Sequence, residues 1–113
     1  MKTHSEIEQY IMNFDGVELI YPFGKEIAVY SINSDKDKMF ALIKVDSDPL
    51  QLSLKCDPQL AEKLREDYET VLPGFNLNSK YWNTILCTGQ VPQDEIKSLI
   101  TISYNLVNSK YFN

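Results

Sequence analysis

The sequence predicts an α+β fold in which an antiparallel sheet carries helices packed on one of its faces. Apolar residues recur at helical spacing in three segments, and strand-like segments lie between the first helix and the last. Short polar turns separate the central strand-like segments, which makes consecutive strands antiparallel neighbours. The expected order along the chain is α-β-β-β-α-β-α. At 113 residues the chain is expected to form a single domain spanning residues 1–113.

The first helix is predicted over residues 5–14, where apolar side chains repeat every three or four positions. Asp15-Gly16 is expected to end it, since glycine is a common helix terminator. A turn follows at residues 21–24. Residues 17–20 are a candidate for one more short strand, which would precede the three strands counted in the order above.

Three strands are predicted next, over residues 27–32, 39–45 and 50–56, with a polar hairpin loop at residues 34–37. The third strand alternates strictly, which predicts one packed face and one solvated face. Its packed face is expected to hold Leu50, Leu52, Leu54 and Cys56, and its solvated face Gln51, Ser53 and Lys55.

Two further helices and one strand complete the predicted fold. Asp57 and Pro58 suit the start of the second helix, as its N-cap and its first helical residue. A loop from residue 73 leads to a strand over residues 81–87, Pro92 starts the third helix, and residues 108–113 form a tail. The third helix is expected to pack through Ile96, Leu99, Ile100, Ser103, Leu106 and Val107. Across the chain, the residues expected to be buried are Leu52, Leu54, Leu64, Ile85, Ile96, Leu99 and Ile100.

Charge and hydropathy narrow the classes of partner. Sixteen acidic residues against eleven basic ones give a net charge of −5, and no run of basic residues occurs. This balance disfavours strong binding to duplex DNA and to anionic membranes, both of which call for a basic face. Apolar runs are too short for a transmembrane helix, and the first residues lack the apolar core of a signal peptide. We therefore expect a cytoplasmic protein without a membrane partner.

Catalytic and cofactor chemistry finds no motif in the sequence. Cys56 and Cys87 stand far apart and are expected to be buried, reduced thiols. The one histidine, His4, lies near the start of the chain, where it is not positioned for acid–base work. The four glycines are isolated and form no phosphate-binding loop. We expect no catalytic residues, no cofactor, no metal site and no enzymatic activity.

Several short segments, in order over nearly the whole chain, carry a family resemblance. They are Tyr21-Pro22-Phe23-Gly24, Lys38-Met39-Phe40-Ala41-Leu42-Ile43, Ser53-Leu54-Lys55-Cys56-Asp57-Pro58, Pro73-Gly74-Phe75, Asn78, Tyr81-Trp82-Asn83-Thr84 and Ser103-Tyr104. Together they resemble the MmcQ/YjbR family of small bacterial proteins. The resemblance implies a CyaY-like architecture, also described as a double wing, and the DNA-binding label usually given to that family. Members commonly carry two basic residues and a histidine just before the Trp-Asn-Thr segment, where this chain has Ser79, Lys80 and Tyr81.

The leading functional hypothesis is therefore a nucleic-acid interface. Lysines would contact phosphates, Tyr81 or Trp82 would stack on a base, and asparagines would bond base edges or phosphates. The candidate residues are Lys36, Lys38, Lys55, Asn76, Asn78, Lys80, Tyr81, Trp82 and Asn83. The competing interpretation makes Phe75 and Trp82 core residues and the lysines mere solubilising charges.

A protein-interaction module, either a homodimer or a chaperone-like protein, is the alternative function. Residues 71–93 contain Lys80 as their only charged residue and several aromatic residues. Interface centres favour this composition. Metal binding, by analogy with frataxin, would need clustered carboxylates, and Glu6, Glu8, Asp15 and Glu18 do not share one helical face.

Overall fold

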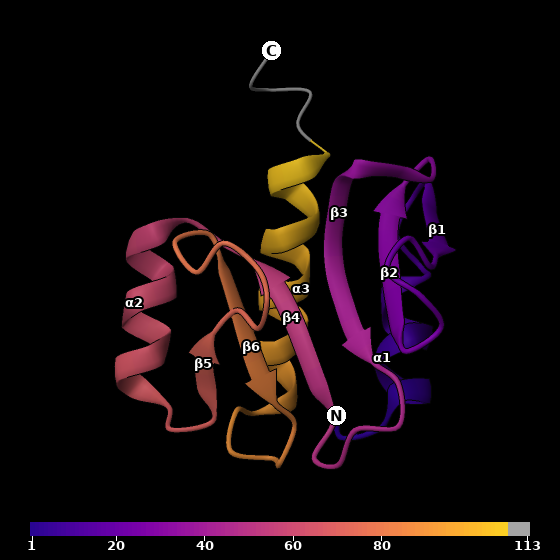
Figure 1. Cartoon of the computed structure of the whole chain (residues 1–113). Coiled ribbons are helices and arrows are strands. Elements are labelled where there is room, and N and C mark those ends of the chain that lie inside the picture. The colour runs from indigo at the N-terminus through magenta and orange to yellow at the C-terminus, as the bar shows by residue number, and fades with distance from the viewer. Residues whose placement is uncertain (109–113) are drawn as a thin grey trace.

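The computed structural model describes residues 1–108, which form an antiparallel sheet with three helices (Figure 1). In chain order the elements are α1 (His4–Ile11), β1 (Val17–Ile20), β2 (Ile27–Ile32), β3 (Asp35–Lys44), β4 (Gln51–Lys55), α2 (Pro58–Asp67), β5 (Val71–Pro73), β6 (Trp82–Leu86) and α3 (Gln93–Val107). The predicted α+β class is confirmed. Of the predicted tail, Asn108 follows α3 directly, and residues 109–113 lie outside the described residues.

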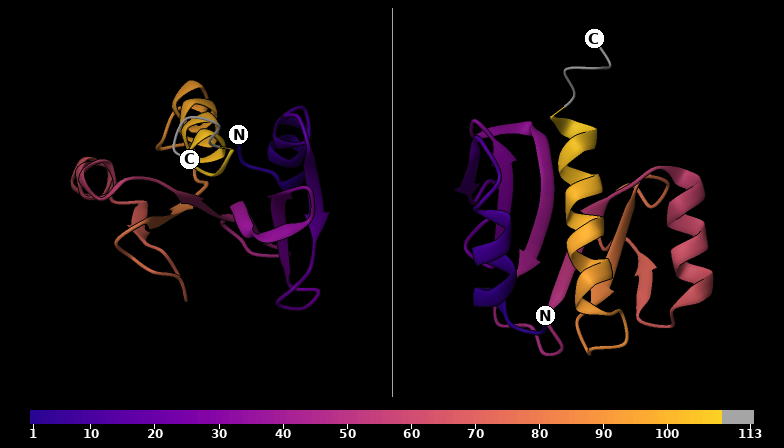
Figure 2. Two further views of the ribbon diagram at one scale, coloured as in Figure 1. Left: turned by 90° about the horizontal axis from the view of Figure 1, so that it is seen from above. Right: turned by 180° about the vertical axis from the view of Figure 1, so that it is seen from behind.

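The six strands lie side by side in the order β1-β2-β3-β4-β6-β5, and every neighbouring pair is antiparallel. All three helices lie on one side of this bent sheet, as the view from above in Figure 2 shows. On the other side the 74–81 loop (residues 74–81) and the loop that joins β1 to β2 project away from the sheet (Figure 2, left). We call this side the helix-free face.

The hairpin between β2 and β3 is tighter than the sequence suggested. Asn33 and Ser34 both have positive φ, at 55° and 59°, and Ile32 already pairs with Asp35. Two left-handed residues make the two-residue turn that fits the twist of a hairpin. The loop predicted at residues 34–37 is therefore wrong, because strand β3 begins at Asp35.

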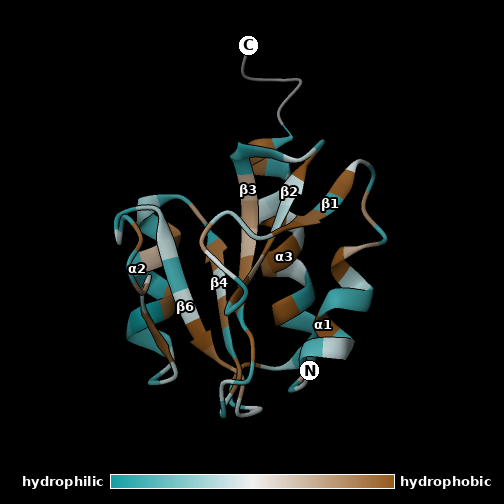
Figure 3. Ribbon diagram, turned by 45° about the vertical axis from the view of Figure 1, so that its right-hand side comes forward, coloured by the Kyte–Doolittle hydropathy of each residue, from teal (hydrophilic) through white to brown (hydrophobic). Residues whose placement is uncertain are grey.

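The main core lies between the sheet and the helices. All seven residues expected to be buried are buried, with exposed fractions of 6% or less. Leu106 is an exception to the predicted face of α3: it is exposed, and Tyr104 packs in the core instead. The Tyr104 hydroxyl donates a 2.6 Å hydrogen bond to the Asp15 carbonyl, which ties α3 to the end of α1. Figure 3 shows that each helix carries both hydrophobic and hydrophilic residues, as helices covering one side of a sheet do.

Ser103 joins two strands where their pairing ends. The β3–β4 ladder runs from Lys44↔Gln51 to Ala41↔Leu54, and beyond it the strands separate. There the Ser103 hydroxyl donates to the Phe40 carbonyl at 2.5 Å and accepts from the Lys55 N–H at 2.9 Å. A buried helix side chain thus replaces one missing rung of the sheet.

Two element boundaries also differ from the predictions. Helix α1 ends at Ile11, earlier than the predicted 5–14, since the Met12 and Asn13 N–H groups already close its last turns. The short edge strand β5, which pairs with β6, was not predicted, and it occupies the residues that lead into the loop predicted from residue 73. Proline at the end of β5 limits its length, since proline cannot donate to a ladder.

Candidate functional site

The helix-free face is less solvated than the alternation of β4 predicts. Gln51 and Lys55 are half-buried there, but Ser53 is buried, which corrects the expected solvated face. Its hydroxyl lies 2.8 Å from the Thr84 hydroxyl of β6. A second, smaller apolar cluster of Val29, Leu42 and Trp82 occupies the same face. The alternation of polar residues in β4 identified the face opposite the core correctly, but it could not show that a loop covers part of that face.

That loop is the 74–81 loop, which Figure 1 shows in front of β6. It is anchored at its start, where the Gly74 N–H donates to the Trp82 carbonyl at 2.9 Å and the Phe75 N–H donates to Thr84 Oγ1 at 3.0 Å. Leu77 packs against the Trp82 cluster from above. Gly74 is required here because an added Cβ would lie 2.7 Å from the Trp82 Cβ.

The asparagines of the loop shape it. Asn76 adopts a positive φ of 58°, which asparagine tolerates better than most residues. The Asn78 side chain accepts from the Lys80 N–H at 3.1 Å, and the Asn78 carbonyl accepts from the Tyr81 N–H. Both side chains are exposed. Their abundance in this segment therefore has a conformational cause, whether or not they also contact a ligand.

Arg65 holds the end of the loop against α2. Its guanidinium Nη1 donates to the Ser79 carbonyl at 2.9 Å and to Asn83 Oδ1 at 3.1 Å. Asn83 in turn donates from Nδ2 to the Ala61 carbonyl at 3.1 Å. The only arginine of the sequence is thus committed to the fold.

Two of the nine predicted contact residues are not available to a ligand. Trp82 is 6% exposed and lies in the second apolar cluster, while Asn83 is 3% exposed and bonded to α2. The competing interpretation was right for Trp82. It was wrong for Phe75, whose side chain is 41% exposed on the helix-free face.

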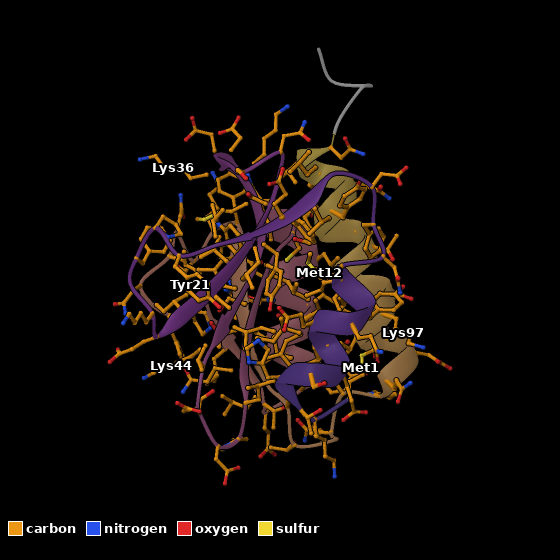
Figure 4. The ribbon with its side chains drawn as sticks, turned by 90° about the vertical axis from the view of Figure 1, so that its right-hand side faces the viewer. Met1, Met12, Tyr21, Lys36, Lys44 and Lys97 are labelled. Atoms are coloured by element: carbon orange, nitrogen blue, oxygen red, sulfur yellow. The ribbon has the colours of Figure 1, made fainter. Side chains whose placement is uncertain are left out.

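The other seven are accessible but do not form one cluster. Lys55, Lys80 and Tyr81 come together at one end of β4 and β6: Lys55 pairs with Trp82 across the strands, and the Lys80 ammonium lies 5.6 Å from the centre of the Tyr81 ring. Lys36 and Lys38 lie apart from these residues, in the first part of β3, where the sequence predicted a loop for Lys36. Figure 4 shows Lys36, Lys44 and Tyr21 on the helix-free side, opposite Lys97.

A depression of about 250 Å³ lies on the same face, between the 74–81 loop and the start of β2. The strands supply Ile27, Leu42, Lys44, Gln51 and Ser53, and the loops supply Glu26, Phe75 and Asn76. Sequence reasoning identified only Asn76 as a candidate contact. Gln51 carried a signal, since the alternation of its predicted strand put it on the solvated face, and Lys44 is the polar residue near the end of the predicted 39–45 strand.

Charge is distributed unequally between the layers. Helices α1, α2 and α3 hold seven carboxylates and three cations, a difference of four charges in a protein of net charge −5. The helix-free face holds Lys44 and Lys55 on its strands and Lys80 on its loop. The negative excess thus lies mainly on the side away from the depression.

The groups considered for other chemistry are occupied or buried. Burial raises the pKa of the Cys56 and Cys87 thiols to about 11, and each thiol directly follows a strand, as free buried cysteines. The His4 ring Nε2 lies 3.1 Å from the Tyr30 hydroxyl and 3.6 Å from Glu8. Within residues 1–108, no three metal-ligating side chains converge, and no helix is both long and apolar enough to cross a bilayer.

Comparison with known proteins identifies the family. The sequence model of the YjbR family matches residues 12–106. The uncharacterized protein YjbR of Escherichia coli (strain K12) is 32% identical over 110 residues, covering 90% of this chain and 84% of that protein. The protein YyaQ of Bacillus subtilis (strain 168) is 26% identical over 117 residues, covering 94% of this chain and 98% of its own.

A solved structure of the same kind confirms the fold. The crystal structure of the Deinococcus radiodurans protein DR2400 superposes with a TM-score of 0.90 at 34% identity, covering all of this chain and 83% of that one. A Pseudomonas syringae protein superposes with a TM-score of 0.77 at 26% identity, covering 93% of this chain and 98% of its own. Sequence and structure agree over almost the full length, and the chain belongs to the YjbR family.

Proposed function

We propose that this protein is a non-enzymatic nucleic-acid-binding protein that takes single strands on its helix-free face. The observation that carries the proposal is that Lys44 and the exposed ring of Phe75 line one depression on the helix-free face, while Lys55, Lys80 and the exposed ring of Tyr81 gather at the far end of β4 and β6. Single strands are bound by such surfaces because lysines follow the backbone while aromatic rings stack on unpaired bases.

The arrangement favours a single strand over a duplex. A duplex binder gains most of its affinity from many phosphate contacts on one basic face. Here the helix-free face offers few lysines, and Glu26 lies beside Lys44 at the depression. Stacking on Phe75 and Tyr81 would add affinity that depends on unpaired bases. We therefore expect weak binding overall, with single strands preferred.

Binding without catalysis fits the remaining chemistry. The thiols are held protonated at neutral pH by burial, and the His4 ring is engaged with Tyr30. Free cysteines are typical of a reducing compartment, so we place this activity in the cytoplasm.

Fluorescence anisotropy with labelled single- and double-stranded DNA, measured from low to physiological salt, tests the proposal. The double variant Lys44→Ala/Lys80→Ala removes two proposed phosphate contacts. It should reduce the slope of log affinity against log salt by about 1.4, or about 0.7 for each contact.

The matched control is Lys63→Ala/Lys97→Ala, which removes the same charge from α2 and α3. Lys63 pairs with Asp67 and Lys97 lies over Tyr10, both on the helix side. Equal losses in the two double variants would mean that only net charge matters. Absence of binding at low salt would refute the proposal.

A protein-interaction module stays the second candidate, on a specific observation. Tyr21 and Phe23 are exposed in the loop that joins β1 to β2, and with Phe75 and Tyr81 they make four exposed rings in the loops of residues 1–108. Exposed aromatic rings are enriched at interface centres. Light scattering across a concentration series would favour this function if the mass increased and DNA did not bind.

A further inference from the structure

We propose that the depression beside Phe75 is a subsite for one unpaired nucleobase. This inference rests on the proposed single-strand binding and adds to it a recognition site and a sequence preference. It is independent of the lysines at the far end of β4. From Gln51 to Lys55 the strand rises about 13 Å, so the two regions are separate contacts on one face.

The depression is built rather than incidental, because its walls are fixed by the sheet. Lys44 and Gln51 pair across β3 and β4, and the Gln51 N–H is held by the Ser47 hydroxyl at 2.9 Å. Phe75 lines the same depression, and its backbone N–H is anchored to Thr84 Oγ1 of the neighbouring strand β6 at 3.0 Å. The resulting volume of about 250 Å³ is open enough to admit one planar ring system.

The ring of Phe75 supplies the face on which a base would stack. Its side chain is 41% exposed although its backbone is anchored, so an aromatic surface is presented in a defined position. Stacking on such a ring is tolerant of base identity because every base has a flat face. Ile27 and Leu42 add apolar lining to the same depression.

The edges of the depression are polar and unused. Gln51 and Asn76 each present a carboxamide, and within residues 1–108 neither side chain takes part in a hydrogen bond. A carboxamide donates and accepts, and it pairs with the mixed donor and acceptor edge of a base. Glu26 adds an acceptor for an amino group, and Lys44 adds a donor for the adjacent phosphate.

This lining fits a nucleobase better than an apolar peptide side chain. An aliphatic group would cover two carboxamides and two charges without pairing them, which is unfavourable. A base satisfies such groups along its edge while its face remains on Phe75. Of the two charges that line the depression, Lys44 suits a polyanion and Glu26 opposes it, while most of the negative excess of the protein lies on the helices.

Anisotropy with two kinds of labelled 12-mer tests the subsite. One carries bases (dA, dC or dT homopolymers) and the other has the same sugar-phosphate charge but abasic positions. We expect the base-containing strands to bind about tenfold more tightly than the abasic strand. Phe75→Ala should remove most of that difference, and Gln51→Ala should reduce the discrimination among the three homopolymers.

Phe23→Ala is the matched control, because Phe23 is an equally large ring, 54% exposed, outside the depression. It should leave the advantage of base-containing strands unchanged. Equal affinity for abasic and base-containing strands would overturn the base subsite while leaving single-strand binding intact. A Phe23→Ala effect as large as that of Phe75→Ala would also overturn it. Failure of both strands to bind would refute the proposed function and the subsite together.

Discussion

Replacing Ser103 by alanine should destabilise the fold more than its size suggests. The hydroxyl is 0% exposed and serves two backbone groups at once, donating to the Phe40 carbonyl and accepting from the Lys55 N–H. The Ser103→Ala variant removes both partners and leaves no side-chain atom to replace them. The perturbation is therefore the loss of a bridge between β3 and β4, not of a methyl-sized volume.

The magnitude follows from these two contacts. A buried backbone group left without a partner costs about 1–3 kcal/mol. Alanine returns about 0.5 kcal/mol through its better helix propensity. With two groups affected and partial relaxation of the separated strands, we expect a loss of about 2–3 kcal/mol in the free energy of unfolding. For a domain of this size that corresponds to a decrease in Tm of roughly 10 °C or more.

Urea denaturation followed by the fluorescence of the buried Trp82 is the assay. Ser98→Ala is the matched control on the same helix: Ser98 is exposed, and its hydroxyl only bonds back to the Asp94 carbonyl. That variant should be neutral or slightly stabilised. A change below about 0.5 kcal/mol for Ser103→Ala, with an unchanged m-value, would refute the bridging role.

Three further predictions concern Gly74 and the two buried thiols. Gly74→Ala should lower the free energy of unfolding by about 1–3 kcal/mol, because its Cβ would meet the Trp82 Cβ at 2.7 Å; urea melts measure this, and a neutral result would contradict the close approach. The native thiols of Cys56 and Cys87, with pKa values near 11, should react with Ellman's reagent at pH 8 about 100-fold more slowly than unfolded thiols. Because folding raises these pKa values from 9.0, the stability they contribute is full below pH 9 and falls between about pH 9 and 11, which melts across that range should show.

The helix side of the fold was predictable because its signals are local and periodic. The alternation of Leu52 and Leu54 and the spacing of Ile96 and Ile100 each report one buried face, and all four are buried. Asp57 caps α2 as predicted, accepting from the Gln59 and Leu60 N–H groups. Such signals depend on neighbours in the chain.

The helix-free face was harder to predict because a distant segment covers part of it. Nothing in the polarity of Ser53 shows that Thr84 bonds to it, and nothing local places Trp82 under Leu77. From the sequence, Asn83 is expected to be a polar surface residue, but in the structure Arg65 and α2 cover it. The burial of Trp82 and that of Asn83 thus have a common feature: each depends on a segment distant in the chain, the 74–81 loop for Trp82 and α2 for Asn83.

The same loop also determines how much of the face a ligand can use. It buries Trp82 and closes part of the sheet, and the exposed groups are left at two places: the depression with Phe75 and the lysines beside Tyr81. Carboxylates on the helices would repel a polyanion that continued around the molecule. On the proposed function, a bound single strand would be confined to one short path along β4, from the depression to the lysines beside Tyr81. The affinity for a single strand would then come from a few defined contacts rather than from a continuous basic surface. Phe75→Ala tests the stacking contact, and Lys44→Ala/Lys80→Ala tests the phosphate contacts.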